Sequence, residues 1–139
     1  MRLNKNSKIA ALRRAPLFAD CSKRELGAIA AIADEINLTP GTAFIREGER
    51  GREFFAIVDG TVAVTKSGRR VEVLGGTDAF GEIALLNDAP RNATVTATSP
   101  VHAIVITERA FKQLLQSSPA LQPKLLSSLA ARLAGDEPV

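Results

Sequence analysis

The chain has 139 residues, of which 45% are hydrophobic and 24% charged, as expected for one globular domain with its own core. Six Phe with no Trp or Tyr, at a net charge of +3, leave little aromatic surface on which single-stranded nucleic acid could stack. One Cys and one His exclude an internal disulfide and a His/Cys metal cluster.

Residues 1–35 are predicted to be a helical segment of the same domain. Residues 5–14 have weak helical character, and Ser22-Lys23-Arg24-Glu25 has the spacing of a capping box that opens a second helix. Cys21 precedes that helix and is expected to be a small buried residue. The basic side chains here favour a solvated helix face over a nucleic-acid patch; they are Arg2, Lys5, Lys8, Arg13, Arg14, Lys23 and Arg24.

Residues 36–107 are predicted to be a β-roll, because short apolar runs alternate with turn signals at even spacing. Asp59-Gly60 predicts a hairpin between FFAIV and TVAV, since Gly tolerates the positive φ of such turns. Ser67-Gly68 predicts a further turn. His102 alternates with apolar residues in VHAIVI, which predicts a strand residue facing outward.

Residues 108–139 are predicted to be two helices, the first from Glu108 to Gln116 and the second opened by Pro119. The second helix carries a leucine every fourth residue, which indicates either core packing or a dimer seam; these are Leu121, Leu125, Leu129 and Leu133. The expected fold class is therefore α+β: an antiparallel β-roll (jelly roll) flanked by N-terminal and C-terminal helices.

One stretch interrupts the β pattern: FGEIALLNDAPRNATV, residues 80–95. Residues 81–86 read as about one helical turn, entered through Gly81, which has no side chain to block a ligand. The first amides of such a turn, those of Ile83 and Ala84, have no intrahelical acceptor. Arg91 adds a planar fork of donors that matches phosphate oxygens. The stretch therefore predicts a phosphate cradle.

Glu82 conflicts with a site for phosphate alone, because its charge opposes that of the ligand. The conflict disappears if Glu82 accepts a hydrogen bond from a hydroxyl next to the phosphate, such as a ribose 2′-OH. The predicted ligand is then a nucleotide.

This stretch resembles the phosphate-binding cassette of cyclic-nucleotide-binding domains, whose pattern is Phe-Gly-Glu, small apolar residues, then Pro-Arg-x-Ala-Thr/Ser-Val. The similarity extends through PLF (16–18), PGTAFIREGE (40–49), FFAIVDGTVAV (54–64) and FKQLLQSSPAL (111–121). The family includes the regulatory domains of catabolite activator protein, of cAMP-dependent kinase regulatory subunits and of cyclic-nucleotide-gated channels. The resemblance implies a β-roll flanked by helices.

The resemblance also implies roles for single residues. Glu82 would bind the ribose 2′-OH and Arg91 the cyclic phosphate. The remaining contacts to the phosphate would come from the backbone of Gly81, Ile83, Ala84, Asn92 and Ala93, and the base pocket would be lined by Val64 and Leu74.

The chain departs from the family pattern at three points. Thr77 stands where the family usually has Gly ahead of the cassette. Asn92 follows the arginine at a position that is often small in cAMP binders and hydroxyl-bearing in many cGMP binders, so selectivity stays open, with cAMP favoured. No aromatic residue follows the last helix to cover the base; Arg132 or Leu133 could cover it, while Arg132 could also pair with Glu82 or be solvated.

The function expected from these residues is a cyclic-nucleotide sensor without catalysis, in which ligand moves the C-terminal helix. We expect a cytoplasmic chain with cAMP as ligand (cGMP being the alternative), no metal, no direct DNA binding and no membrane segment. Its effector is a separate protein or domain, and a homodimer could form through the C-terminal helix. The alternatives are a degenerate domain kept for protein contacts, in which Glu82 pairs with Arg91, and a fragment of a transcription regulator without its DNA-binding domain.

Overall fold

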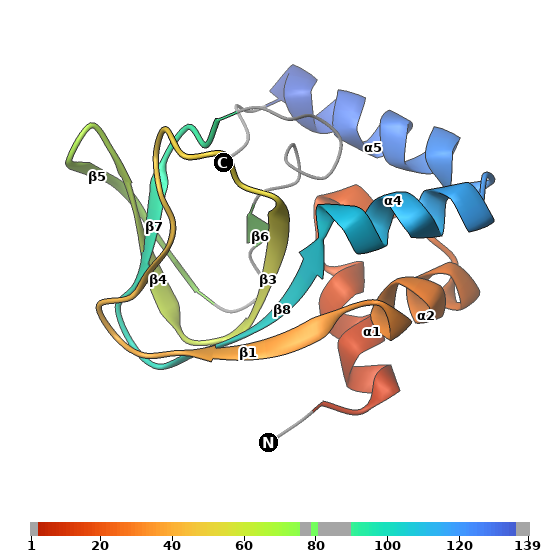
Figure 1. Ribbon diagram of the computed structural model, residues 1–139, viewed down its shortest axis with the longest axis horizontal. Coiled ribbons are helices and arrows are strands. Elements are labelled where there is room, and N and C mark those ends of the chain that lie inside the picture. Colours follow the sequence, from red (N-terminus) through yellow and green to blue (C-terminus); the bar gives the residue numbers. More distant parts are fainter. Residues whose placement is uncertain (1–2, 76–78, 81–89, 136–139) are drawn as a thin grey trace.

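The computed structural model describes residues 3–75, 79–80 and 90–135, and Figure 1 shows their arrangement. The N-terminal segment forms helix α1 (Lys5–Arg13), the 3-10 turn η1 (Pro16–Phe18) and helix α2 (Lys23–Ala31). The predicted capping box is confirmed: the Glu25 amide donates to Ser22 Oγ at 3.1 Å, and the Ser22 amide donates to Glu25 Oε1 at 2.8 Å. Two amides at the start of α2 thus gain acceptors.

The side chains of this segment divide as expected between solvent and core. Cys21 is buried. Lys8 is half-buried and donates from Nζ to the Ala33 carbonyl at 3.0 Å. The other described basic residues are exposed, as a solvated face requires; they are Lys5, Arg13, Arg14, Lys23 and Arg24.

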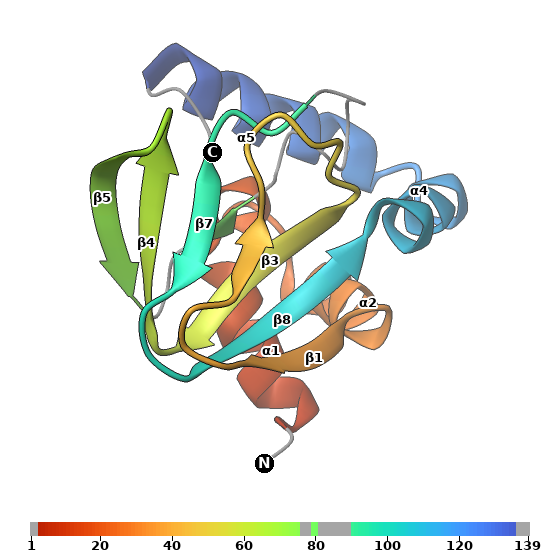
Figure 2. The same cartoon turned by 60° about the vertical axis from the view of Figure 1, so that its left-hand side comes forward.

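Eight described strands form two four-stranded antiparallel sheets. Sheet A has the order β1-β8-β3-β6, and sheet B has the order β2-β7-β4-β5. Figures 1 and 2 show the sheets facing each other as a roll, with the helices beside sheet A. The strands are β1 (Asp34–Leu38), β2 (Ala43–Ile45), β3 (Glu53–Asp59), β4 (Thr61–Lys66), β5 (Arg69–Gly75), β6 (Ala79–Phe80), β7 (Thr94–Ala97) and β8 (Val101–Thr107).

Sheet A is covered on both faces, and this explains the unbroken apolar run in β3. Phe55 and Ile57 point into the roll, where they join the core between the two sheets. Phe54 and Ala56 point the other way, into a second core formed with the helices. Because a strand alternates its side chains between two faces, four consecutive apolar residues require apolar surroundings on both.

The hairpin predicted at Asp59-Gly60 is wrong. Strands β3 and β4 belong to different sheets, so this turn carries the chain across the roll. Gly60 has φ of 105°, as the turn chemistry required, and a Cβ there would lie 2.4 Å from the Pro100 carbonyl oxygen. Turn residues predict a reversal of the chain, whereas strand pairing depends on long-range contacts. A hairpin does form at Ser67-Gly68, between β4 and β5.

His102 lies on β8 as expected, but it is half-buried and does not point freely into solvent. Its Nε2 lies 2.8 Å from Glu35 Oε1, and its Nδ1 lies 2.9 Å from Asn37 Oδ1, both on the neighbouring strand β1. The same Glu35 oxygen accepts from the Leu3 amide at 2.8 Å, which ties the N-terminal segment to sheet A. The alternating pattern identified the strand but could not show the partners across it.

The C-terminal segment forms α4 (Glu108–Ser117) and α5 (Leu121–Gly135). Thr107 caps α4 by accepting from the Ala110 amide at 3.2 Å. Leu121 and Leu125 of α5 are each 1% exposed and belong to the core of the helices, so the first two leucines of the stripe serve as core packing. Within the described part of the chain, no helix has the length and apolar character needed to cross a membrane.

Candidate functional site

The centre of the candidate site is Arg91, whose backbone is fixed on the loop before β3. The Arg91 amide donates to the Glu49 carbonyl at 2.9 Å, and the Gly48 amide donates to the Arg91 carbonyl at 2.9 Å. Next to them, Arg50 and Pro90 form an isolated antiparallel bridge. The end of the predicted cassette is therefore joined to residues 48–50 by a short ladder, which sets the direction in which the Arg91 side chain leaves the backbone.

The Arg91 side chain is buried, although guanidinium groups are rarely found inside proteins without partners. Its exposed fraction is 8%, and among the residues whose burial the structure describes it is the one charged residue in the core. Its Nη2 donates to the Glu53 carbonyl at the start of β3. Burial lowers the pKa of the guanidinium, and the Glu53 carboxylate opposes that shift in pKa. Arginine nevertheless stays charged at neutral pH.

This arrangement suits the capture of an anion. Burial of a cation costs free energy because the charge loses its water, and an anionic ligand can offset that cost. The Coulomb attraction between the two charges is also stronger at a buried site than at an exposed one. The guanidinium also presents its donors as a planar fork that matches phosphate geometry. Sequence reasoning identified Arg91, and the structure places its guanidinium in a buried position beside the Glu53 carbonyl.

The structure brings two further predicted residues next to Arg91. Asn92 is half-buried. Ala93 is fully buried in the core between the sheets, immediately before β7. Four other predicted contacts lie outside the described residues, namely Gly81, Glu82, Ile83 and Ala84.

The residues predicted for the base pocket and its cover fall on three elements, β4, β5 and α5. Val64 on β4 is fully buried inside the roll. Leu74 lies on β5, and its backbone is paired with Val62 of β4. Arg132 and Leu133 lie in the second half of α5. The strands that carry Val64 and Leu74 are thus neighbours in sheet B.

Two residues in contact with Arg91 were missed by the sequence reasoning: Gly51 and Glu53. Gly51 has no side chain, so its residue type carries no sign of a contact with Arg91. Its position against the guanidinium depends on how residues 48–53 fold back over the cassette. Glu53 acts through its backbone carbonyl, which any residue type has, so no sequence signal pointed to it.

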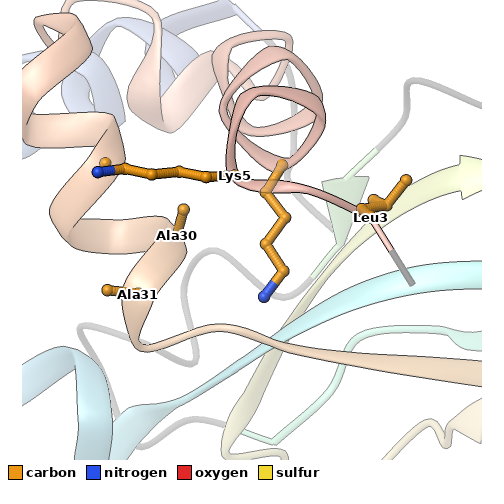
Figure 3. A pocket seen from close by; sticks show the side chains of 6 residues that line it. Leu3, Lys5, Ala30 and Ala31 are labelled. Carbon is orange, nitrogen blue, oxygen red and sulfur yellow. The ribbon is translucent and has the colours of Figure 1, made fainter.

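A separate cavity of about 270 Å³ lies between α1 and α2, away from Arg91. Figure 3 shows Lys5 extending from α1 toward α2, near Ala30. The remaining lining residues include Leu3, Lys8 and Gly27. Lys8 is already engaged with the Ala33 carbonyl, and the small residues of α2 allow the two helices to approach closely. We assign this cavity to helix packing.

Among the described residues, no three His, Cys, Asp or Glu side chains are grouped as a metal site would need.

Relatives of the chain include two kinds of protein kinase component. A cAMP-dependent protein kinase regulatory subunit from Yarrowia lipolytica is 39% identical over 106 residues, which cover 75% of this chain and 28% of that protein. A cGMP-dependent protein kinase from Eimeria tenella is 37% identical over 115 residues, which cover 82% of this chain and 12% of that protein. The chain therefore spans between about an eighth and a quarter of the length of these relatives.

A solved structure and a family model agree with the fold. The regulatory domain of Toxoplasma gondii PKA, crystallised with cAMP, is similar with a TM-score of 0.73 and 32% identity, covering 79% of this chain and 44% of that chain. The family model described as "Cyclic nucleotide-binding domain" matches residues 35–118, which include the sheets and the segment around Arg91. The chain belongs to the family of cyclic nucleotide-binding domains.

Proposed function

We propose that this chain binds a cyclic nucleotide, cAMP in preference to cGMP, and acts as a ligand-driven sensor without a reaction of its own. The observation that carries the proposal is the buried Arg91, held between the Glu53 carbonyl and the 48–50 loop at the end of the cassette. A buried cation at this position of the family fold is best explained by an anionic ligand.

In the proposed complex, Arg91 binds the cyclic phosphate and Glu82 accepts a hydrogen bond from the ribose 2′-OH. Gly81 allows the backbone to approach the ligand closely. Backbone amides share the negative charge of the phosphate, since helix starts and oriented amides attract anions; these belong to Ile83, Ala84, Asn92 and Ala93. The base lies against Val64 and Leu74, with Arg132 or Leu133 covering it.

The preference for cAMP rests on Asn92, which lacks the hydroxyl often found at this position in cGMP binders. The relatives include a cAMP-dependent and a cGMP-dependent protein at similar identity, 39% and 37%, so similarity alone does not decide the ligand. Direct comparison of the two nucleotides is therefore the test of selectivity.

The response to ligand is proposed to travel through the C-terminal helices. The phosphate draws the cassette inward, and Leu85 and Leu86 repack against α4. The apolar surface of α4 consists of Phe111 and Leu114, which are buried, and Leu115, which is half-buried. Helix α5 then moves over the base. Ligand can shift this equilibrium only by binding one state more tightly than the other.

The output is proposed to be a protein contact, made with a separate effector or with another domain, in the cytoplasm. Helix α5 offers a surface for a second copy of the chain, since Leu126 is 59% exposed beside the buried Leu125. An exposed leucine of this kind is commonly covered in an assembly.

Isothermal titration of nucleotide-stripped protein with cAMP and with cGMP tests the proposal. We expect cAMP to bind more tightly than cGMP. We expect Arg91→Ala to weaken cAMP binding by roughly 10- to 150-fold, because a charged hydrogen bond contributes about 1.5–3 kcal/mol. Arg13→Ala, which removes an exposed arginine on α1, serves as the matched control and should bind as the wild type does.

Two results would contradict the proposal. If folded wild-type protein gave no heat with either nucleotide, the domain would be a degenerate one kept for protein contacts. If Arg91→Ala and Arg13→Ala bound cAMP equally well, the ligand would not use Arg91.

A further inference from the structure

Gly51 lies directly against the Arg91 guanidinium. A Cβ placed on Gly51 would be 1.7 Å from Arg91 Nε, 2.2 Å from Cζ and 2.4 Å from Nη2. All three distances are far inside van der Waals contact. Any side chain at position 51 and the present position of the guanidinium therefore exclude each other.

The reason for glycine at this position is space and not backbone conformation. Gly41, Gly48, Gly60 and Gly68 have positive φ, a region that favours glycine. Gly51 is outside that region, so its backbone would accept another residue. The contact with Arg91 is what a larger residue would disturb.

We propose that Gly51 is a positioning residue for ligand binding: it leaves the space in which Arg91 is held ready for the phosphate. The inference rests on the proposed function, because it assigns to Arg91 the role of phosphate ligand. This role requires no contact between Gly51 and the ligand.

Three contacts hold Arg91 in this place. The 48–49 backbone fixes its main chain, the Glu53 carbonyl accepts from Nη2, and the bare face of Gly51 receives the guanidinium. A side chain that is already ordered loses less conformational freedom when the ligand arrives, so preorganisation raises affinity. Residues 51–53 thus hold the Arg91 side chain in a fixed position before the ligand binds.

A side chain at position 51 should displace Arg91 without unfolding the domain. The atoms that it would meet are the end of a long, flexible side chain, which can rotate away more easily than backbone can shift. When the guanidinium of Arg91 moves away from Gly51, its Nη2 also loses the hydrogen bond to the Glu53 carbonyl. We therefore expect a loss of ligand affinity that grows with the size of the residue at position 51.

The experiment is a double-mutant cycle measured by titration with cAMP. Gly51→Val should lower affinity by roughly the same 10- to 150-fold as Arg91→Ala, and Gly51→Ala should lower it less. In the Arg91→Ala background, Gly51→Val should cause no further loss, because the side chain through which it acts has gone. Gly27→Ala, a glycine substitution on α2 far from Arg91, is the control and should leave affinity unchanged.

The proposal is overturned if Gly51→Val binds cAMP within about two-fold of wild type, or if its effect adds fully to that of Arg91→Ala. If the wild type itself binds no nucleotide, the proposed function fails. The contact between Gly51 and Arg91 is then tested by thermal unfolding of four proteins: wild type, Gly51→Val, Arg91→Ala and the double variant. Gly51→Val should then lower the midpoint less in the Arg91→Ala background than in wild type. Equal decreases in both backgrounds would show that Gly51 and Arg91 do not interact.

Discussion

Cys21 illustrates how burial alone controls the chemistry of one residue. It is 4% exposed, and burial, with a smaller contribution from Glu25, raises the pKa of its thiol from 9.0 to about 11. Because only the thiolate is a nucleophile, we expect the folded protein to react very slowly with a thiol reagent at pH 8, and at the rate of a free thiol in urea. Rapid labelling of the folded chain would contradict this burial.

The same thiol makes stability depend on pH. The unfolded thiol ionises near pH 9.0 and the folded one near 11, so the unfolded state binds fewer protons between these values. Stability is therefore fully present below pH 9 and should decrease as pH rises toward 11. Urea denaturation of wild type and Cys21→Ala at pH 8 and pH 10.5 measures the difference. A decrease of equal size in Cys21→Ala would assign the pH dependence to other groups.

A residue whose chemistry is unusual for its surroundings could be predicted from the sequence, whereas the residues that hold it in position could not. Arg91 was recognisable because a planar cation follows a small apolar turn, which is a rare combination. Gly51 and Glu53 act through an absent side chain and a backbone carbonyl, and neither leaves a distinctive residue pattern. Their contact with Arg91 exists only after the loop before β3 has folded against the cassette.

At the scale of elements, local sequence signals predicted helix starts and turns correctly, but they did not predict which strands pair with each other. Ser22 and Glu25 lie within one turn, so their capping box follows from the local sequence. The turn at Asp59-Gly60 was also local, but the partners of β3 are β8 and β6, whose paired residues come more than twenty positions later. Which strand pairs with which depends on the burial of both faces of sheet A, a property of the complete fold.

The first turns of helix α5 are anchored to the rest of the domain, which limits where the helix can move. At its first turns, Leu121 and Leu125 are buried in the core of the helices, and Lys124 Nζ lies 2.7 Å from Glu25 Oε1 of α2. After Leu125, the side chain of Leu126 and those of residues 130–131 are exposed, while half-buried Ser128 donates from Oγ to Asp20 Oδ2 at 3.4 Å. If α5 moves as proposed, we expect the hinge after residue 125, where the buried anchors Leu121 and Leu125 end.

Hydrogen exchange can test this hinge. With saturating cAMP, we expect slower amide exchange across residues 126–135, because the helix half that is proposed to cover the base would lose access to solvent. Residues 121–125 should change little, since they are already anchored in the core. Arg91→Ala at the same cAMP concentration is the control and should show a smaller effect. Equal exchange in 126–135 with and without cAMP would remove the proposed helix movement.

At the scale of the whole molecule, sheet A makes the domain one cooperative unit. Its inner face builds the core of the roll, and its outer face builds the core with the helices, so neither core can melt alone without exposing the other.

A ligand bound beside Arg91 should therefore stabilise roll and helices together. At a cAMP concentration of 100 Kd, mass action adds about 2.7 kcal/mol, which raises Tm by about 10 °C for a chain of this size. Differential scanning calorimetry should show a single transition that moves as a whole, and by much less in Arg91→Ala. Two transitions, of which only one responds to cAMP, would mean that the shared sheet does not couple the two cores.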